Sequence, residues 1–136
     1  MPAAPVLDSH ALLAFFRGEP AGVAVKALLQ KAASADRPVG LTEVNYAEVK
    51  YILIKKDGIE AWKQAAEVLK SLPIEFHPAD RALSDQAADY KARFRISLAD
   101  AFAAALAREK KAELVTGDRE FKALEKEIKI SWLPAD

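Results

Sequence analysis

The sequence of 136 residues contains no cysteine, one methionine and five glycines, and its charges cancel to a formal net charge of zero. Without cysteine the chain has neither disulfides nor thiolate-bound metal, and it is compatible with a reducing compartment. Twenty basic and twenty acidic side chains give no overall attraction to nucleic acid. Any phosphate-binding surface must therefore be local or depend on a bound cation.

Long hydrophobic runs are also missing. No segment approaches the ~20 apolar residues that cross a bilayer. The start, MPAAPVLDSHALLAFF, lacks the basic stretch and long apolar run of a signal peptide. We therefore expect a soluble, cytoplasmic protein without a membrane partner. A chain of this length buries roughly two-thirds of its unfolded surface, so we expect a single domain over residues 1–136.

Short apolar or β-branched runs alternate with longer helical patterns along the chain. The patterns predict strands at 5–8, 39–42, 74–76, 113–116 and 128–133, and helices at 11–18, 20–34, 43–56, 59–72, 79–94, 97–110 and 118–127. Short strands separated by helices indicate crossover connections and a parallel sheet with helices on both faces. The predicted fold class is α/β, with three α/β/α layers.

Four carboxylates fall at one edge of this predicted sheet, where ligands bind beyond the carboxyl ends of the strands. Asp8 closes the first strand, and Asp118 follows the fourth strand by two residues. Glu48 lies in the second turn of the helix after the second strand. The helix that feeds the fourth strand must begin at the same edge, and Asp100 lies in its first turn.

Each of these acids also has a purely structural explanation. Asp8 and Asp118 are good N-caps for the helices that follow them. Ser97 and Asp100 resemble a capping box, and Glu48 could be a solvated helix position. A cap contributes only ~1 kcal/mol, so a single acid would not indicate a functional site.

Their convergence is harder to explain structurally. Two charges ~4 Å apart repel by about 4 kcal/mol at an effective dielectric of 20. Several ionised carboxylates on one patch therefore need a cation among them, or some must stay protonated. Carboxylate oxygens are the ligands that Mg²⁺ and Mn²⁺ prefer. We therefore expect a site for one of these ions.

The other polar and aromatic residues indicate less. Thr116, at the end of the fourth strand, could orient Asp118 or a metal-bound water, or could be only a strand residue. N-capping is the default role for Ser9 and packing for His10. The helix 43–56 is apolar over nearly its whole circumference, which indicates burial under a partner as well as against its own sheet.

Four stretches in this order resemble the PIN domain family, and within it the VapC toxins of type II toxin–antitoxin pairs: VLDSHALLAFF, LTEVNYAEVKYIL, ISLADAFAAALAREKKAELVTGDREF and ISWL. The resemblance implies the sheet order 3-2-1-4-5 and a Mg²⁺- or Mn²⁺-dependent ribonuclease site. It assigns the family's metal-binding and catalytic acids to Asp8, Glu48, Asp100 and Asp118, with Thr116 as their catalytic companion. Glu43 competes with Glu48, but Glu48 lies six residues after Thr42, as the family pattern expects.

The function that the resemblance implies is hydrolysis of an RNA phosphodiester by a metal-activated water. The implied partners are a cognate VapB-like antitoxin, for which the helices at 43–56 and 58–71 are candidates, and a second copy of the chain. Two alternatives stay open: a PIN nuclease of RNA processing without an antitoxin, and a non-enzymatic receiver-like signalling domain. The residues that contact phosphate are not determined by the sequence; the candidates are Arg17, Arg93, Arg95 and Arg119.

Overall fold

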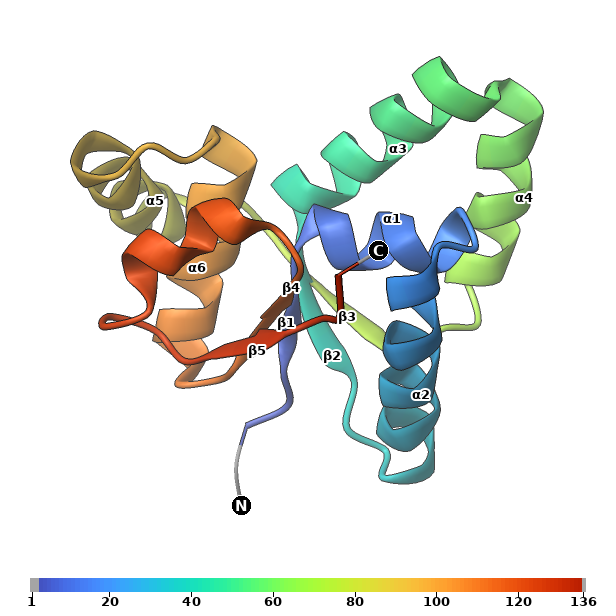
Figure 1. The fold of residues 1–136 in the computed structure, drawn as a ribbon, viewed down its shortest axis with the longest axis horizontal. Coiled ribbons are helices and arrows are strands. Elements are labelled where there is room, and N and C mark those ends of the chain that lie inside the picture. The colour runs from blue at the N-terminus through green and yellow to red at the C-terminus, as the bar shows by residue number, and fades with distance from the viewer. Residues whose placement is uncertain (1–2, 136) are drawn as a thin grey trace.

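Five parallel strands form the central layer of the structure, a computed structural model that describes residues 3–135 (Figure 1). The strands are β1 (Val6–Leu7), β2 (Val39–Thr42), β3 (Ile74–His77), β4 (Leu114–Thr116) and β5 (Ile130–Trp132). Their order is β3-β2-β1-β4-β5, and all neighbouring pairs are parallel. This confirms the predicted fold class and strand order. β1 lies in the middle, and β3 and β5 are the two edges.

Helices cover both faces of the sheet (Figure 1). One face is covered by α1 (Ser9–Phe16), α2 (Pro20–Ser34), α3 (Glu43–Asp57) and α4 (Ile59–Leu69). The other is covered by α5 (Arg81–Arg93), α6 (Leu98–Lys110) and the 3₁₀ helix η1 (Arg119–Leu124). No helix within residues 3–135 is long and apolar enough to cross a membrane.

The central strands are mostly apolar because both of their faces are buried, and the polar exceptions, Thr42 and Thr116, lie at the carboxyl ends of β2 and β4. Val6 packs into the core beneath α5 and α6, whereas Leu7 packs into the core beneath α1 and α2. Leu114 and Val115 of β4 divide between the two cores in the same way. Parallel sheets covered on both sides therefore show continuous hydrophobic runs rather than alternation.

Helix α6 carries the alanine-rich run of the sequence and is buried over most of its length. Every residue from Ala99 to Ala107 is buried, Asp100 included. The helix packs against the sheet, against α5 and against the start of α3, so it has little solvent-facing surface. Small side chains permit this close approach on several sides. The burial of one carboxylate in this helix is the feature that requires a compensating interaction.

The structure differs from the sequence prediction mainly at the ends of elements. The predicted helix over 118–127 is instead the six-residue 3₁₀ helix η1. Its buried side chains, Phe121 and Leu124, are three residues apart, which matches the three residues per turn of a 3₁₀ helix. The strand predicted at 5–8 has two residues, because the chain leaves the sheet at Asp8 to begin α1.

Candidate metal centre

Asp8 lies at the carboxyl end of β1, in the centre of the sheet, and is completely buried. One of its oxygens accepts a hydrogen bond of 2.8 Å from the amide of Ala11 and so caps α1. The other accepts one of 2.5 Å from the hydroxyl of Thr116 at the end of β4. Each oxygen keeps a further lone pair for another ligand. The predicted cap is therefore real, and it leaves the carboxylate able to bind a cation.

Thr116 connects two of the predicted acids. Its buried hydroxyl donates to Asp8 and accepts a hydrogen bond of 2.9 Å from the backbone amide of Asp118. The loop after β4 is thereby held against the end of β1. Of the two roles considered for Thr116, the structure shows an orienting one, directed at Asp8 and at the backbone of Asp118.

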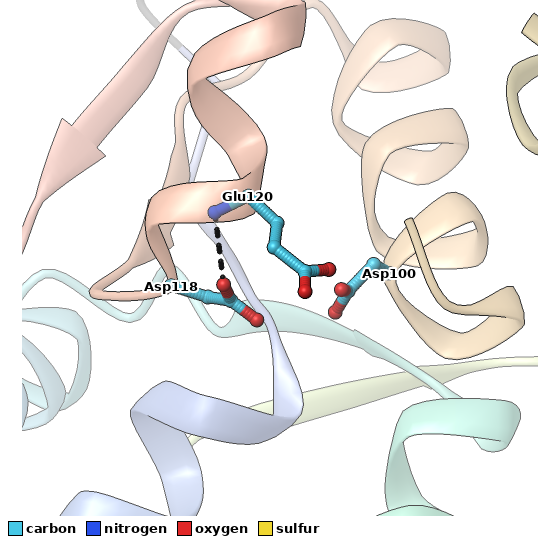
Figure 2. Close-up of side chains that lie close together, drawn as sticks. All are labelled: Asp100, Asp118 and Glu120. Atoms are coloured by element: carbon cyan, nitrogen blue, oxygen red, sulfur yellow. Dashed lines mark hydrogen bonds between the residues drawn. The ribbon is translucent and has the colours of Figure 1, made fainter. Parts of the chain in front are cut away.

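Asp100, Asp118 and Glu120 bring their carboxylates together at this edge (Figure 2). One oxygen from each lies within 4.8 Å of the others. Asp100 comes from the first turn of α6, and Asp118 and Glu120 come from the start of η1. Asp118 also caps η1, since it accepts a hydrogen bond of 3.0 Å from the amide of Glu120. Sequence analysis missed Glu120, because only the tight 3₁₀ turn directs its side chain back toward Asp118.

Burial and mutual repulsion raise the pKa of two of these acids. The pKa of Asp8 rises from 3.8 to about 7, chiefly because the carboxylate is desolvated and further because Asp100 and Asp118 are near. The pKa of Asp100 rises to about 6 through burial, then through the charge of Asp118 and more weakly through those of Glu48 and Glu120. The pKa values of Asp8 and Asp100 therefore depend on the charges of the other sequence-predicted acids.

The acids do not all approach equally closely. Among residues 3–135, the group within 4.8 Å contains neither Asp8 nor Glu48. Glu48 is half-buried in α3 and acts on Asp100 through its charge. Its rival Glu43 is exposed in the first turn of α3. An all-oxygen donor set at one edge fits a hard divalent cation such as Mg²⁺ or Mn²⁺.

Asn45 is a second residue that sequence analysis did not select. Its hydrogen bonds link the starts of α1, α3 and α6. It is fully buried at the start of α3. Its amide group donates to the hydroxyl of Ser9 at 2.9 Å and to the carbonyl of Ala99 at 3.2 Å. Ser9 and Ala99 are the immediate neighbours of Asp8 and Asp100 along the chain. Ser9 is thus engaged with Asn45 and is not the N-cap of α1, which is Asp8.

His10 packs against the loop that carries Asp118. A Cβ atom placed on Gly117 would lie 2.6 Å from the imidazole of His10, so this position has no room for a side chain. The packing role expected of His10 is therefore observed.

A cavity of about 840 Å³ lies at the amino ends of the strands, opposite the acids, between the C-terminal ends of α2 and α6 and the segment before β5. Its rim carries basic side chains such as Lys31 and Lys111. Helix C-termini are the negative ends of helix dipoles, which favour such cations. This cavity contains none of the acids described above, so it is not the candidate metal centre.

A family model described as PIN domain matches residues 6–127. The chain belongs to the PIN domain family. The predicted membership is thereby confirmed. A search among curated proteins finds no match.

Solved structures share this PIN fold along nearly the whole chain. VapBC2 from Rickettsia felis, bound to a DNA fragment of its promoter, has a TM-score of 0.76 at 16% identity and covers 96% of this chain and 98% of its own. DNA-bound VapBC from Salmonella typhimurium has a TM-score of 0.73 at 17% identity, over 96% and 98%. VapC20 from Mycobacterium tuberculosis, a toxin that cleaves the sarcin-ricin loop, has a TM-score of 0.70 at 21% identity, over 88% and 93%.

The raised pKa values predict how stability depends on pH in the metal-free protein. Asp8 and Asp100 have folded-state pKa values of about 7 and about 6, above the ordinary 3.8. The native state therefore holds more protons than the unfolded chain between these values and the ordinary one. The free energy of unfolding should fall as the pH rises through this window. The decrease is up to ~1.4 kcal/mol per pH unit for each of the two carboxyls. Urea unfolding at several pH values in EDTA measures this decrease.

The matched variants for this measurement are Asp8→Asn and Asp85→Asn. The first removes the titrating group and should flatten most of the decline, because asparagine has no proton to lose. The second removes an exposed acid of α5 and should leave the wild-type curve unchanged. Parallel curves for wild type and Asp8→Asn would contradict the raised pKa.

The hydrogen bonds of Asn45 predict a large loss of stability on truncation. Asn45→Ala leaves a buried hydroxyl and a buried carbonyl without their donor, and we expect a cost of about 2–3 kcal/mol in urea unfolding. Ser9→Ala, which deletes one partner of Asn45, should cost about 1 kcal/mol. Equal costs for the two variants would show that Asn45 does not link the three helix starts.

Proposed function

We propose that this protein is a Mg²⁺- or Mn²⁺-dependent ribonuclease that acts in the cytoplasm as the toxin of a VapBC-type toxin–antitoxin pair. The observation that carries the proposal is the gathering of carboxylates from β1, α6 and η1 at one edge of a PIN domain. The similarity of fold to VapC20, a toxin that cleaves the sarcin-ricin loop, supports RNA as the substrate.

In this proposal Asp8 and Asp100 are the principal metal ligands. Asp118 and Glu48 bind a second ion or order its waters, and Glu120 adds a carboxylate beside Asp118. Thr116 and the amide of Ala11 fix the two oxygens of Asp8 so that its orientation does not depend on the ion. A divalent cation, when bound, lowers the pKa of a coordinated water and neutralises charge on the phosphate.

The protonation states of Asp8 and Asp100 determine the pH at which the site can bind a metal ion. Near neutral pH and without metal, Asp8 with a pKa of about 7 retains its proton in a large fraction of molecules. A cation favours the ionised form, so metal affinity should rise with pH until Asp8 and Asp100 are both deprotonated. In this proposal the attacking group is water.

The proposal predicts metal-dependent cleavage of RNA. Purified protein should cut an unstructured RNA with Mg²⁺ or Mn²⁺ and stop on addition of EDTA. Asp8→Asn and Asp100→Asn should lower kcat by at least about 10²-fold, since each removes a ligand charge. Asp85→Asn, which lies outside the site, should retain full activity.

The stability of these variants separates catalysis from folding. Metal-free Asp8→Asn should be at least as stable as wild type at pH 7, because it removes a buried, repelled charge. Its inactivity would then not result from unfolding. Cleavage that persists in EDTA, or full activity in both variants, would refute the metal centre.

The receiver-like alternative is disfavoured by topology. Receiver domains have the strand order 2-1-3-4-5, whereas this sheet has the order β3-β2-β1-β4-β5. The third strand here is an edge strand ending in Glu75, Phe76 and His77. It therefore supplies no aspartate to the central strand ends, where a receiver is phosphorylated.

A surface on α3 and α4 favours an antitoxin over a free-standing RNA-processing nuclease. Tyr51 is 51% exposed, Ile59 49% and Val68 42%, although all three are large and apolar. Tyr51 belongs to α3, for which the sequence predicts apolar character on nearly all sides, and Ile59 and Val68 belong to α4. We infer that a VapB-like antitoxin or a second copy of the chain covers this surface.

Expression in a bacterial host tests for an antitoxin. The wild-type chain should arrest growth and Asp100→Asn should not, because arrest requires RNA cleavage. Co-expression with a short gene, where one lies adjacent to this one, should restore growth and yield a complex in gel filtration. Absence of both arrest and complex, with cleavage intact in vitro, would favour the RNA-processing nuclease.

A further inference from the structure

Several basic side chains of the described chain are already paired with carboxylates. Arg17 bonds Asp57 at 2.9 Å, and Arg93 bonds Glu127 at 3.1 Å. Further ion pairs join Arg108 to Glu127, Lys129 to Glu113, Lys63 to Glu60, Lys70 to Glu67 and His77 to Glu75. Two of the four arginines considered from the sequence are therefore used elsewhere.

Arg119 is exposed and differs from these residues. It lies between Asp118 and Glu120, yet within residues 3–135 no carboxylate is within ion-pairing distance of its guanidinium. The carboxylates of its two neighbours face Asp100 (Figure 2). The guanidinium of Arg119 lies over the indole ring of Trp132 instead, 4.9 Å from the ring centroid.

Trp132 places this cation beside the metal centre. In the β4–β5 ladder, Trp132 is the partner of Thr116, and neighbouring strands lie ~4.8 Å apart. Thr116 is the residue whose hydroxyl bonds Asp8. Trp132 is half-buried, and β5 is the edge strand, so no further strand of the described chain covers this side.

The contact with Trp132 holds the charge without neutralising it. A cation–π contact restricts the side chain, and no carboxylate of residues 3–135 competes for the N–H donors of the guanidinium. Those donors match a phosphate in a two-pronged geometry. Arg95, the fourth of the arginines considered from the sequence, is exposed and has no ring contact in the described chain. It is not held in position in this way.

We propose that Arg119, positioned by the ring of Trp132, binds a phosphate next to the scissile one and directs the RNA strand across the acids toward the β5 edge. Arg119 is then a substrate-binding residue and Trp132 a positioning residue. The inference rests on the proposed ribonuclease function and adds where the substrate's backbone lies.

Steady-state cleavage of an unstructured RNA tests this assignment. Arg119→Ala should raise KM about tenfold and leave kcat within about twofold, because a contact to a non-reacting phosphate binds the ground and transition states equally. The slope of log KM against log salt should decrease by about 0.7, the value of one phosphate contact on a single strand. The Mn²⁺ concentration for half-maximal rate should stay unchanged.

Conservative variants separate substrate binding from structure. Arg119→Lys should recover the salt slope and most of KM, since the charge remains. Trp132→Phe retains a ring and should behave like wild type, whereas Trp132→Leu should raise KM as Arg119→Ala does. Arg93→Ala is the matched control, because Arg93 also lies over a ring, 4.8 Å from Phe94, but is paired with Glu127. It should leave KM and the salt slope unchanged.

Two results would overturn the assignment. One is an Arg119→Ala enzyme with the KM and salt slope of wild type, and the other is a fall in kcat at constant KM. Binding of the same RNA to Asp100→Asn protein, with and without Arg119→Ala, tests the contact without cleavage. Absence of cleavage by wild type would refute the ribonuclease function, whereas unchanged binding in this pair would refute only the role of Arg119.

Discussion

The burial of Asp8 at the end of the central strand is the constraint on which the rest of the site depends. A carboxylate without solvent there resists ionisation. The fold supplies two hydrogen bonds, from Thr116 and from the amide of Ala11, that favour the charged form but do not restore an ordinary pKa. Because the pKa of Asp8 remains above its ordinary value, the ionised carboxylate is unfavourable unless a cation is bound. The site is therefore least stable when it is ionised and holds no metal.

Capping, which is the structural explanation for a single acid in the sequence, does not exclude coordination in this structure. Asp8 caps α1 and Asp118 caps η1 through one oxygen each. A cap fixes the χ angles of a carboxylate by a local bond, and this pre-orients its other lone pairs. Helix starts therefore suit a metal centre, because parallel strands deliver several of them to one edge of the sheet.

Neutral overall charge and a polyanionic substrate are compatible because the charges are separated in space. Acids gather at the carboxyl edge, and many basic side chains form ion pairs away from it. Exposed pairs of this kind contribute little to stability, but they engage the cations that form them. Arg119 beside Trp132 is held by an aromatic ring, which keeps its full charge available next to the acids.

The sequence by itself determined the alternation of strands and helices and the edge at which Asp8, Glu48, Asp100 and Asp118 lie. Chain direction in a parallel sheet decides that edge, and the hydrophobic pattern reveals the direction. Only the tertiary structure decided which atoms meet. Glu120 approaches Asp118 through a 3₁₀ turn that the sequence suggested as an ordinary helix. Asn45 and Arg119 acquire their roles from Ala99 and Trp132, partners 54 and 13 positions away in sequence. Such contacts depend on how elements pack, and local propensity carries no information about them.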